Sequence, residues 1–217
     1  MQRNILRFAA ILLAVVVMAS ASTAQMRSNK FGVGAGGSLY IFAYDGNEGL
    51  LKPGGSLNLS YSIYEHIGIR AMFGAGQLGW KTGSTNNTTT LLSGNLYLSY
   101  DVLPHSAFNP FVFGGVGGIY FDPHSDAGVY ATNFASFNKM DINYLGGVGF
   151  DYFFSEFFSV TVSGEAALTN TDWLDGSKSV SASNDNYKRI NIEFRYYFFD
   201  QTYVTNLIKA LQERMRK

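Results

Sequence analysis

The sequence has no cysteine among its 217 residues, and it has only four prolines and three histidines. Without cysteine the fold cannot rest on disulfide bridges, and the chain has no thiol for a lipid anchor or a thiolate metal site. Charged residues are also scarce, at 15% of the chain, and they balance, with 16 Lys and Arg against 16 Asp and Glu. Such a balance gives no basic field for nucleic acid. Stability must therefore come from a large hydrogen-bonded sheet, a bound partner or a membrane.

The sequence also lacks an apolar run that could cross a bilayer as a helix. The run Phe8–Met18 holds 11 residues, whereas a spanning helix needs about 20. Two arginines precede this run, and Ser22 and Ala24 follow it where a signal peptidase requires small residues. We expect residues 1–24 to be a signal peptide that is cleaved near Ala24-Gln25. The alternative is an N-terminal membrane anchor.

Aromatic residues and glycine are abundant in place of the missing types. The chain has 18 Phe, 14 Tyr, 2 Trp and 24 Gly. Removing the two arginines of the leader leaves 14 basic against 16 acidic residues, a net charge of −2. The remaining length suits one domain. An exported, aromatic-rich chain without membrane-spanning helices favours a closed transmembrane β-barrel.

Alternating polar and apolar residues, the pattern of half-buried strands, recur in eight segments. The clearest example places Leu57, Leu59 and Tyr61 on one face and the intervening Ser and Asn residues on the other. Segments of 10 to 14 residues suit tilted, membrane-spanning strands. The expected strands are 31–44, 55–64, 67–80, 89–100, 110–121, 140–153, 157–169 and 187–199.

The connections between these segments alternate between short and long. Tight turns are expected at Glu65-His66 and Ser155-Glu156, and a moderate one at 101–109. The long polar connections are Asp45–Lys52, Lys81–Thr88, Asp122–Lys139 and Asn170–Asn186. Short periplasmic turns against long outer loops are typical of outer-membrane barrels. Both chain ends should then lie on the periplasmic side.

Aromatic residues gather near the tight turns, where a barrel carries its girdle at the membrane interface. The alternative is the core of a soluble β-sandwich, whose strands alternate too. The expected girdle consists of Tyr61, Tyr64, Tyr100, Phe111, Phe113, Tyr152 to Phe154, Phe157, Phe158 and Tyr196 to Phe199.

Five charged residues fall on the small, polar faces of the expected strands: Arg70, Asp151, Glu165, Glu193 and Arg195. In an eight-stranded barrel this face is a narrow interior filled by side chains. Buried charges there must pair. We expect a polar interior with a network of Arg70, Arg195, Glu165 and Glu193, and with Asp151 near the periplasmic end. Five separately solvated charges are the alternative.

Four segments resemble the small outer-membrane β-barrel proteins of the OmpA/OmpX type, over about residues 31–199. They are Asn109–Gly117, Leu145–Tyr152, Thr171–Asp175 and Tyr187–Phe199. The resemblance implies an all-β, eight-stranded antiparallel barrel domain (25–200), without a peptidoglycan-binding domain. It also implies contact with outer-membrane lipids and lipopolysaccharide.

The last strand of that family ends in alternating aromatics that the barrel-assembly machinery reads, and Phe194, Tyr196 and Phe198 match this pattern. The present chain departs from the family by continuing through a basic tail, residues 201–217. Its apolar positions lie on one helical stripe. We expect a short amphipathic helix that frays at the barrel mouth, lies on an anionic membrane surface or docks a periplasmic partner.

Residues that would carry chemistry are few. Three scattered histidines without cysteine predict no metal site, and no cofactor is expected. His124, Ser125 and Asp126 are the candidates for a lipid A-modifying enzyme, but three consecutive residues cannot normally form a catalytic relay. We expect a monomer with a structural, adhesion or surface-recognition role through segments 122–139 and 170–186. A narrow solute pore, an enzyme and a secreted ligand carrier are the alternatives.

Overall fold

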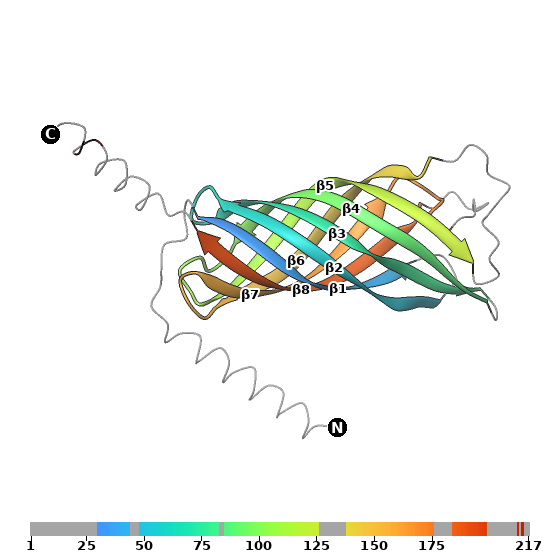
Figure 1. Cartoon of the computed structure of the whole chain (residues 1–217), viewed down its shortest axis with the longest axis horizontal. Coiled ribbons are helices and arrows are strands. Elements are labelled where there is room, and N and C mark those ends of the chain that lie inside the picture. Colours follow the sequence, from blue (N-terminus) through green and yellow to red (C-terminus); the bar gives the residue numbers. More distant parts are fainter. Residues whose placement is uncertain are drawn as a thin grey trace, which may run out of the picture.

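The computed structural model describes residues 30–43, 48–82, 85–125, 138–175 and 184–198, together with Gln212 and Arg214. Eight antiparallel strands form a closed barrel in which each strand pairs with its neighbours in sequence and β8 pairs with β1 (Figure 1). The strands are β1 (Phe31–Ala43), β2 (Glu48–Ser62), β3 (Ile67–Thr82), β4 (Thr85–Asp101), β5 (Phe108–Ser125), β6 (Met140–Phe153), β7 (Phe158–Thr169) and β8 (Asn186–Phe198). The predicted all-β, eight-stranded antiparallel barrel is confirmed.

The two ends of the barrel differ. One end carries the start of β1, the end of β8 and the short connections 63–66, 102–107 and 154–157, and we call it the turn end (Figure 1). The opposite end, called the loop end, carries segments 126–137 and 170–185.

No helix among the described residues is long and apolar enough to cross a membrane. Residues 1–24 and, apart from Gln212 and Arg214, residues 201–217 lie outside the described part, so the signal peptide and the tail helix stay predictions.

Two of the four long outer connections were predicted wrongly. Strands β3 and β4 continue until Thr82 pairs with Thr85, so most of 81–88 is strand. Strand β2 already begins at Glu48, and a β-bulge lies between Leu50 and Gly54. The polar composition of these segments indicated loops, but threonine-rich sequence such as that of β4 also suits strands that extend beyond an apolar belt. Strand β5 likewise continues to Ser125, and Asn186 belongs to β8, so both remaining loops are shorter than expected.

Apart from the bulge in β2, side chains alternate between the exterior and the interior. Leu57 and Leu59 are exposed on the exterior, whereas Asn58 and Ser60 between them are buried inside. This outer apolar surface is what a lipid-facing wall requires. Most of the expected girdle faces outward at the turn end, including Tyr61, Tyr100, Tyr152, Phe158 and Tyr196.

Four aromatic residues were assigned to the girdle wrongly: Phe111, Phe113, Phe153 and Tyr197. Phe111 and Phe113 share the inward face of β5 with the buried Asn109, and Phe111 is itself buried. Tyr197 is buried and, together with Phe153, lines the interior cavity beside Arg70. The Arg70 guanidinium carbon lies 3.8 Å from the centre of the Phe111 ring. A clustering of aromatics near a turn does not distinguish the two faces of a strand, which follow from alternation alone.

Candidate functional site

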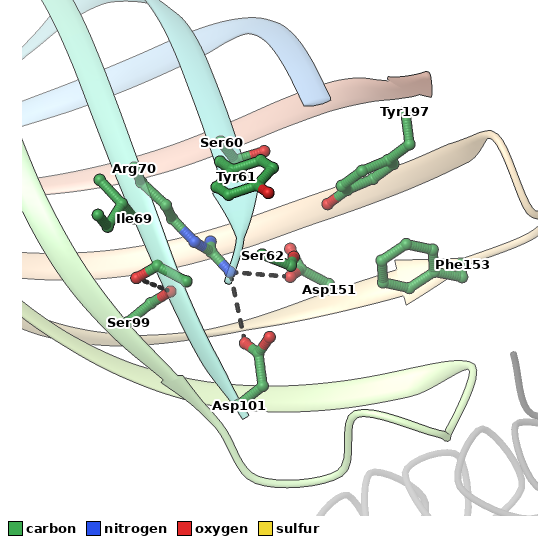
Figure 2. Close-up of a pocket in the computed structure, with 11 residues that line it drawn as sticks. Ser60, Tyr61, Ser62, Ile69, Arg70, Ser99, Asp101, Asp151, Phe153 and Tyr197 are labelled. Atoms are coloured by element: carbon green, nitrogen blue, oxygen red, sulfur yellow. Dashed lines mark hydrogen bonds and ion pairs between the residues drawn. The ribbon is translucent and has the colours of Figure 1, made fainter. Parts of the chain in front are cut away.

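Charged side chains fill the interior of the turn-end half. The turn-end charge cluster comprises Arg70, Asp101, Asp151, Glu193 and Arg195, all of them buried. Arg70 Nη2 lies 3.1 Å from Asp151 Oδ2 and 3.6 Å from Asp101 Oδ1 (Figure 2). Arg195 Nη1 lies 3.4 Å from Asp151 Oδ1, and Arg195 Nη2 lies 2.9 Å from Glu193 Oε2. The cluster is a continuous chain of alternating sign from β4 to β8.

Hydroxyl and amide groups add further hydrogen bonds to this cluster. Thr161 Oγ1 donates to Asp151 Oδ1 over 2.5 Å, and the Asn191 amide donates to Glu193. The cavity beside Arg70 provides about 10 Å³, which is the space of roughly one water molecule. Buried charges held this way are stable in pairs and costly to leave alone. The arrangement blocks the interior at this end.

A second ion pair lies in the middle of the barrel. Arg189 Nη2 lies 2.7 Å from Glu165 Oε1, and the two residues are cross-strand neighbours on β8 and β7. The Tyr97 hydroxyl accepts from Arg189 and donates to Glu165, and the Tyr40 hydroxyl accepts from Arg189 at 3.3 Å. Gly74 makes room for this pair, because a Cβ there would come 2.6 Å from Arg189 Nη1.

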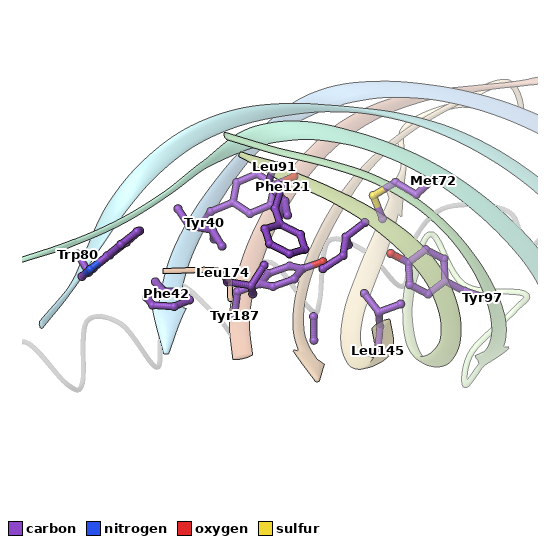
Figure 3. Packing of buried hydrophobic residues seen from close by; sticks show 13 residues of the cluster. Tyr40, Phe42, Met72, Trp80, Leu91, Tyr97, Phe121, Leu145, Leu174 and Tyr187 are labelled. Atoms are coloured by element: carbon purple, nitrogen blue, oxygen red, sulfur yellow. The ribbon is translucent and has the colours of Figure 1, made fainter. Parts of the chain in front are cut away.

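The loop-end half of the interior is apolar, which corrects the expectation of a polar interior throughout. Large side chains from five strands and one loop pack together there (Figure 3). This loop-end apolar core contains Tyr40, Phe42, Leu78, Trp80, Leu91, Ile119, Phe121, Leu174 and Tyr187. The core is continuous with buried residues such as Met72 and Leu145 deeper in the barrel. Apolar packing of this kind excludes water without directional bonds.

The segment Thr171–Asp175 and Asp185 together close the loop end, and we call them the cap. Leu174 is fully buried in the apolar core. Thr89 Oγ1 donates to the Leu174 carbonyl over 2.5 Å, and the Leu174 N–H donates to Asp185 Oδ2 over 2.8 Å. The Asp185 N–H in turn donates to the Thr171 carbonyl. The Leu174 side chain, which the sequence placed in a polar surface loop, therefore packs into the barrel and helps to close its loop end.

Asp185 is an unusual anchor for the cap because it is buried beside two other carboxylates. Burial raises the pKa of Asp185 to about 7, and the nearby charges of Asp175 and Asp172 act in the same direction. Hydrogen bonds from the N–H groups of Leu174 and Asp175 oppose this shift. The protonation of Asp185 is thus coupled to the closed cap near neutral pH.

All five charged residues singled out from the sequence lie in the interior, but they form two groups. The structure brings Arg70, Asp151, Glu193 and Arg195 together, while Glu165 belongs to the mid-barrel pair. Sequence reasoning missed Arg189 and Asp101. Alternation could have found both, because Arg189 shares its face with Glu193 and Arg195 and Asp101 shares its face with Tyr97.

The aromatic residues proposed as an assembly signal lie at the turn end of β8. Phe194 and Tyr196 are exposed on the outer wall. The Phe198 ring packs edge-on against Phe31 at 5.1 Å, and the Tyr196 ring lies 5.0 Å from that of Phe158. The structure gives these residues a place on the exterior, and their role in assembly stays a prediction.

The geometry around His124 differs from a hydrolase triad. His124 Nδ1 lies 2.9 Å from the Asp122 carbonyl oxygen, and Nε2 lies 3.6 Å from Asp122 Oδ2. Asp126, the third of the candidate residues for a lipid A-modifying enzyme, lies outside the described residues. Within the described ranges, no three His, Asp or Glu side chains are grouped closely enough to hold a metal ion.

Comparison with known protein families shows that residues 10–198 match the family described as "Outer membrane protein beta-barrel domain". The chain belongs to this family. It is an integral β-barrel of the bacterial outer membrane. No curated protein sequence matches the chain. The turn end is then the periplasmic end and the loop end the extracellular one, since barrels of this class keep their short turns in the periplasm.

Solved structures with the same fold come from several bacteria. Neisserial surface protein A is 14% identical, with a TM-score of 0.56, and the match covers 77% of this chain and 97% of that one. The attachment invasion locus protein Ail of Yersinia pestis is 12% identical, with a TM-score of 0.53, covering 79% and 99%. OprG of Pseudomonas aeruginosa is 18% identical, with a TM-score of 0.52, covering 82% and 100%. At these identities the likeness concerns the fold.

Proposed function

We propose that this protein is a closed outer-membrane scaffold that presents segments 126–137 and 170–185 at the cell surface for adhesion or recognition. The observation that carries this proposal is the filled interior, with charge at one end and apolar packing under a cap at the other. A barrel that leaves no wide path for solutes offers its extracellular segments as the part that varies in function. The same observation counts against the narrow-pore alternative.

The composition of these segments narrows the kind of partner. Segment 126–137 carries Asp126 as its single charge, and segment 170–185 has three Asp against Lys178. Ail, a protein with the same fold, has been crystallised in complex with the heparin analogue sucrose octasulfate. The acidic segments of this chain disfavour such a sulfated polyanion. Tyr130, Phe134 and Phe137, set among Ser, Thr and Asn, suit contact with a protein surface instead.

The experiment compares bacteria that display the wild-type barrel with bacteria that display a Tyr130→Ser, Phe134→Ser, Phe137→Ser variant. Adherence is measured to a panel of immobilised extracellular proteins and to heparin. We expect adherence to a protein surface that is lost in the triple variant, and none to heparin. Equal adherence of the two strains, or binding to heparin alone, would contradict the proposal. A heat-dependent shift in gel migration verifies that each barrel is folded.

We further propose that the barrel is a monomer without enzymatic activity and that Phe194, Tyr196 and Phe198 are read by the barrel-assembly machinery. The pairing of both His124 nitrogens with Asp122 leaves no resemblance to a serine relay. A His124→Ala strain with unaltered lipid A supports the absence of activity, and altered lipid A would contradict it. A Phe198→Ser variant should reach the outer membrane in reduced amount, whereas Phe157→Ser should not.

A further inference from the structure

The opening of the barrel at the turn end, called the periplasmic mouth, carries apolar side chains that the strands do not cover. Leu103 follows the buried Asp101 by two residues, so it continues the inward face of β4 over this mouth. Its N–H donates to Asn109 Oδ1, which belongs to a buried side chain. Leu103 is nevertheless 49% exposed, and Tyr64 on the turn between β2 and β3 is 67% exposed. Uncovered apolar side chains at a polar opening mark a surface that another segment covers.

The same mouth has an excess of negative charge. The turn-end charge cluster beneath it contains three carboxylates and two guanidinium groups. Glu65 and Glu156 lie on the turns at the rim, and Lys30 precedes β1 at the same end. With the histidines neutral, the described residues of the mouth thus have five acidic side chains against three basic ones. A segment that covers this mouth should therefore be basic on its polar side.

The tail, residues 201–217, starts at this mouth and has the length to cross it. Strand β8 ends at Phe198, and in the closed strand order β8 lies opposite β4, the strand that leads to Leu103. Strands about 4.8 Å apart and tilted by about 40° give an eight-stranded barrel a diameter of about 16 Å. A helix from Val204 to Lys217 would be about 20 Å long. The tail can therefore reach from β8 to the turn between β4 and β5.

The tail also has the two faces that such a position requires. Its apolar residues fall on one helical stripe, which consists of Val204, Leu207, Ile208, Leu211 and Met215. Four basic side chains against Glu213 give the tail a net charge of +3. Its two described residues, Gln212 and Arg214, have helical backbone conformation and exposed side chains. The stripe suits the apolar side chains of the mouth, and the basic residues suit its acidic rim.

We propose that the tail folds back as an amphipathic helix across the periplasmic mouth of its own barrel. The apolar stripe covers Leu103 and Tyr64, and the basic side chains lie near Glu65 and Glu156. Of the three places that the sequence allows for the tail, the mouth is the one for which the structure supplies apolar contacts, opposite charge and a matching span. The tail thus shields the turn-end charge cluster from the periplasm, and this closure is independent of the extracellular segments proposed to bind a surface partner.

The absence of cysteine from the chain permits a direct cross-linking test. In a helical tail Leu211 lies about 15 Å from residue 201, which places it near Leu103 across the mouth. Leu103→Cys is combined with Leu211→Cys or with Leu207→Cys, one turn earlier on the same stripe. The control combines Leu103→Cys with Glu213→Cys, which lies close to Leu211 along the tail but on the opposite helical face.

Each variant is oxidised in outer membranes and, after purification, in phosphatidylcholine vesicles, and disulfide-linked peptides are quantified by mass spectrometry. A disulfide needs Cβ atoms about 4 Å apart, so we expect at least fivefold more cross-link from one of the two stripe positions than from Glu213→Cys. Equal yields from the stripe and the control, or no cross-link from either stripe position, would overturn the proposal. Heat-dependent gel migration shows that each variant is folded.

The membranes used separate the mouth from the two other places for the tail. The yield should be the same in vesicles that contain phosphatidylglycerol, and a fall there would assign the tail to an anionic bilayer surface. Cross-linking in vesicles that is lost in outer membranes would assign it to a periplasmic partner. Glu65→Gln with Glu156→Gln should slow the cross-linking by roughly threefold, the effect of one or two exposed ion pairs. An unchanged rate would overturn the part assigned to the acidic rim.

Discussion

The two halves of this barrel solve the same packing problem with opposite chemistry. Both halves are enclosed by the same eight strands with the same alternation of inward and outward side chains. The turn-end half is filled by the three acidic and two basic side chains of one connected charge cluster. The loop-end half is filled by aromatic and aliphatic residues under a cap. A strand pattern fixes which residues face inward, but it leaves the chemistry of the interior open.

The difference predicts different responses to substitution. Each charge in the turn-end half has specific partners at fixed distances, so a single deletion leaves a buried charge unpaired. In the loop-end half a deletion leaves a cavity, and its energetic cost depends on how well the neighbours can relax. The turn-end half should therefore be the more sensitive to single substitutions and the more tolerant of paired ones.

The largest effect is expected for Asp151→Ala. Asp151 contacts both Arg70 and Arg195, so its removal leaves two buried guanidinium groups short of a partner. We expect a loss of about 3–5 kcal/mol in the free energy of unfolding, measured by urea titration in lipid vesicles. Asp122→Ala is the control, because this carboxylate pairs with Lys139 at the partly exposed rim and should contribute less than about 1 kcal/mol. Similar losses for the two variants would contradict the account.

A smaller loss is expected from the apolar half. Leu91 is fully buried in the loop-end apolar core, while the next residue, Leu92, faces outward. Leu91→Ala should destabilise the barrel by roughly 2–4 kcal/mol, and Leu92→Ala by less than about 1 kcal/mol because lipid fills the space that it leaves. The same urea titration measures both. A larger loss for Leu92→Ala would show that the assignment of the two faces is wrong.

Removing one hydrogen bond from the cap should have a still smaller effect. The Thr89 hydroxyl donates to the Leu174 carbonyl across the mouth of the barrel. Thr89→Val should weaken the cap by about 1 kcal/mol, seen as faster protease cleavage within 170–185 while the urea midpoint of the barrel stays near that of the wild type. Thr90→Val, on the outward face, is the matched control. Cleavage at the wild-type rate would contradict the role of this bond.

The most local effect is a pH dependence of the cap alone. The pKa of Asp185 in the closed cap, about 7, exceeds the ordinary value of an aspartate, 3.8, so the open state binds fewer protons between these values. Closure should therefore weaken as the pH rises from about 4 to about 7. The fluorescence of Trp173 in a Trp80→Phe background reports this opening, and Asp185→Asn should abolish the change. An unaltered pH response in Asp185→Asn would rule out this residue as its source.

Alternation was sufficient to predict the fold from the sequence. The period of two in segments such as Leu57–Tyr61 is a local property, and it correctly separated inward from outward side chains there, whereas aromatic clustering alone wrongly placed Phe111 and Phe113 on the outer wall. The strand ends were harder to predict, because residues 85–88 are polar in composition although they pair with β3. Polar residues suit both a loop and a strand that extends above the apolar belt, so composition could not distinguish these two.

The candidate site shows the same limit. Alternation places Glu165 and Arg195 inside, and the same rule places Arg189 inside. It could not predict that Glu165 faces Arg189 across β7 and β8, or that Arg195 reaches Asp151 on β6, because those distances depend on the register and curvature of the closed sheet. The cap could not be predicted from the sequence either, since Leu174 lies in a polar segment and is buried only by tertiary packing.

The most direct test of the sealed interior is the single-channel conductance of the mature wild-type barrel in planar lipid bilayers. The account predicts a silent membrane at both polarities, because the turn-end charge cluster and the capped apolar core each block the interior. Reproducible conductance steps from the folded, heat-modifiable protein would contradict it. Such steps would show that a continuous water path exists past Arg70, Asp151 and Leu174.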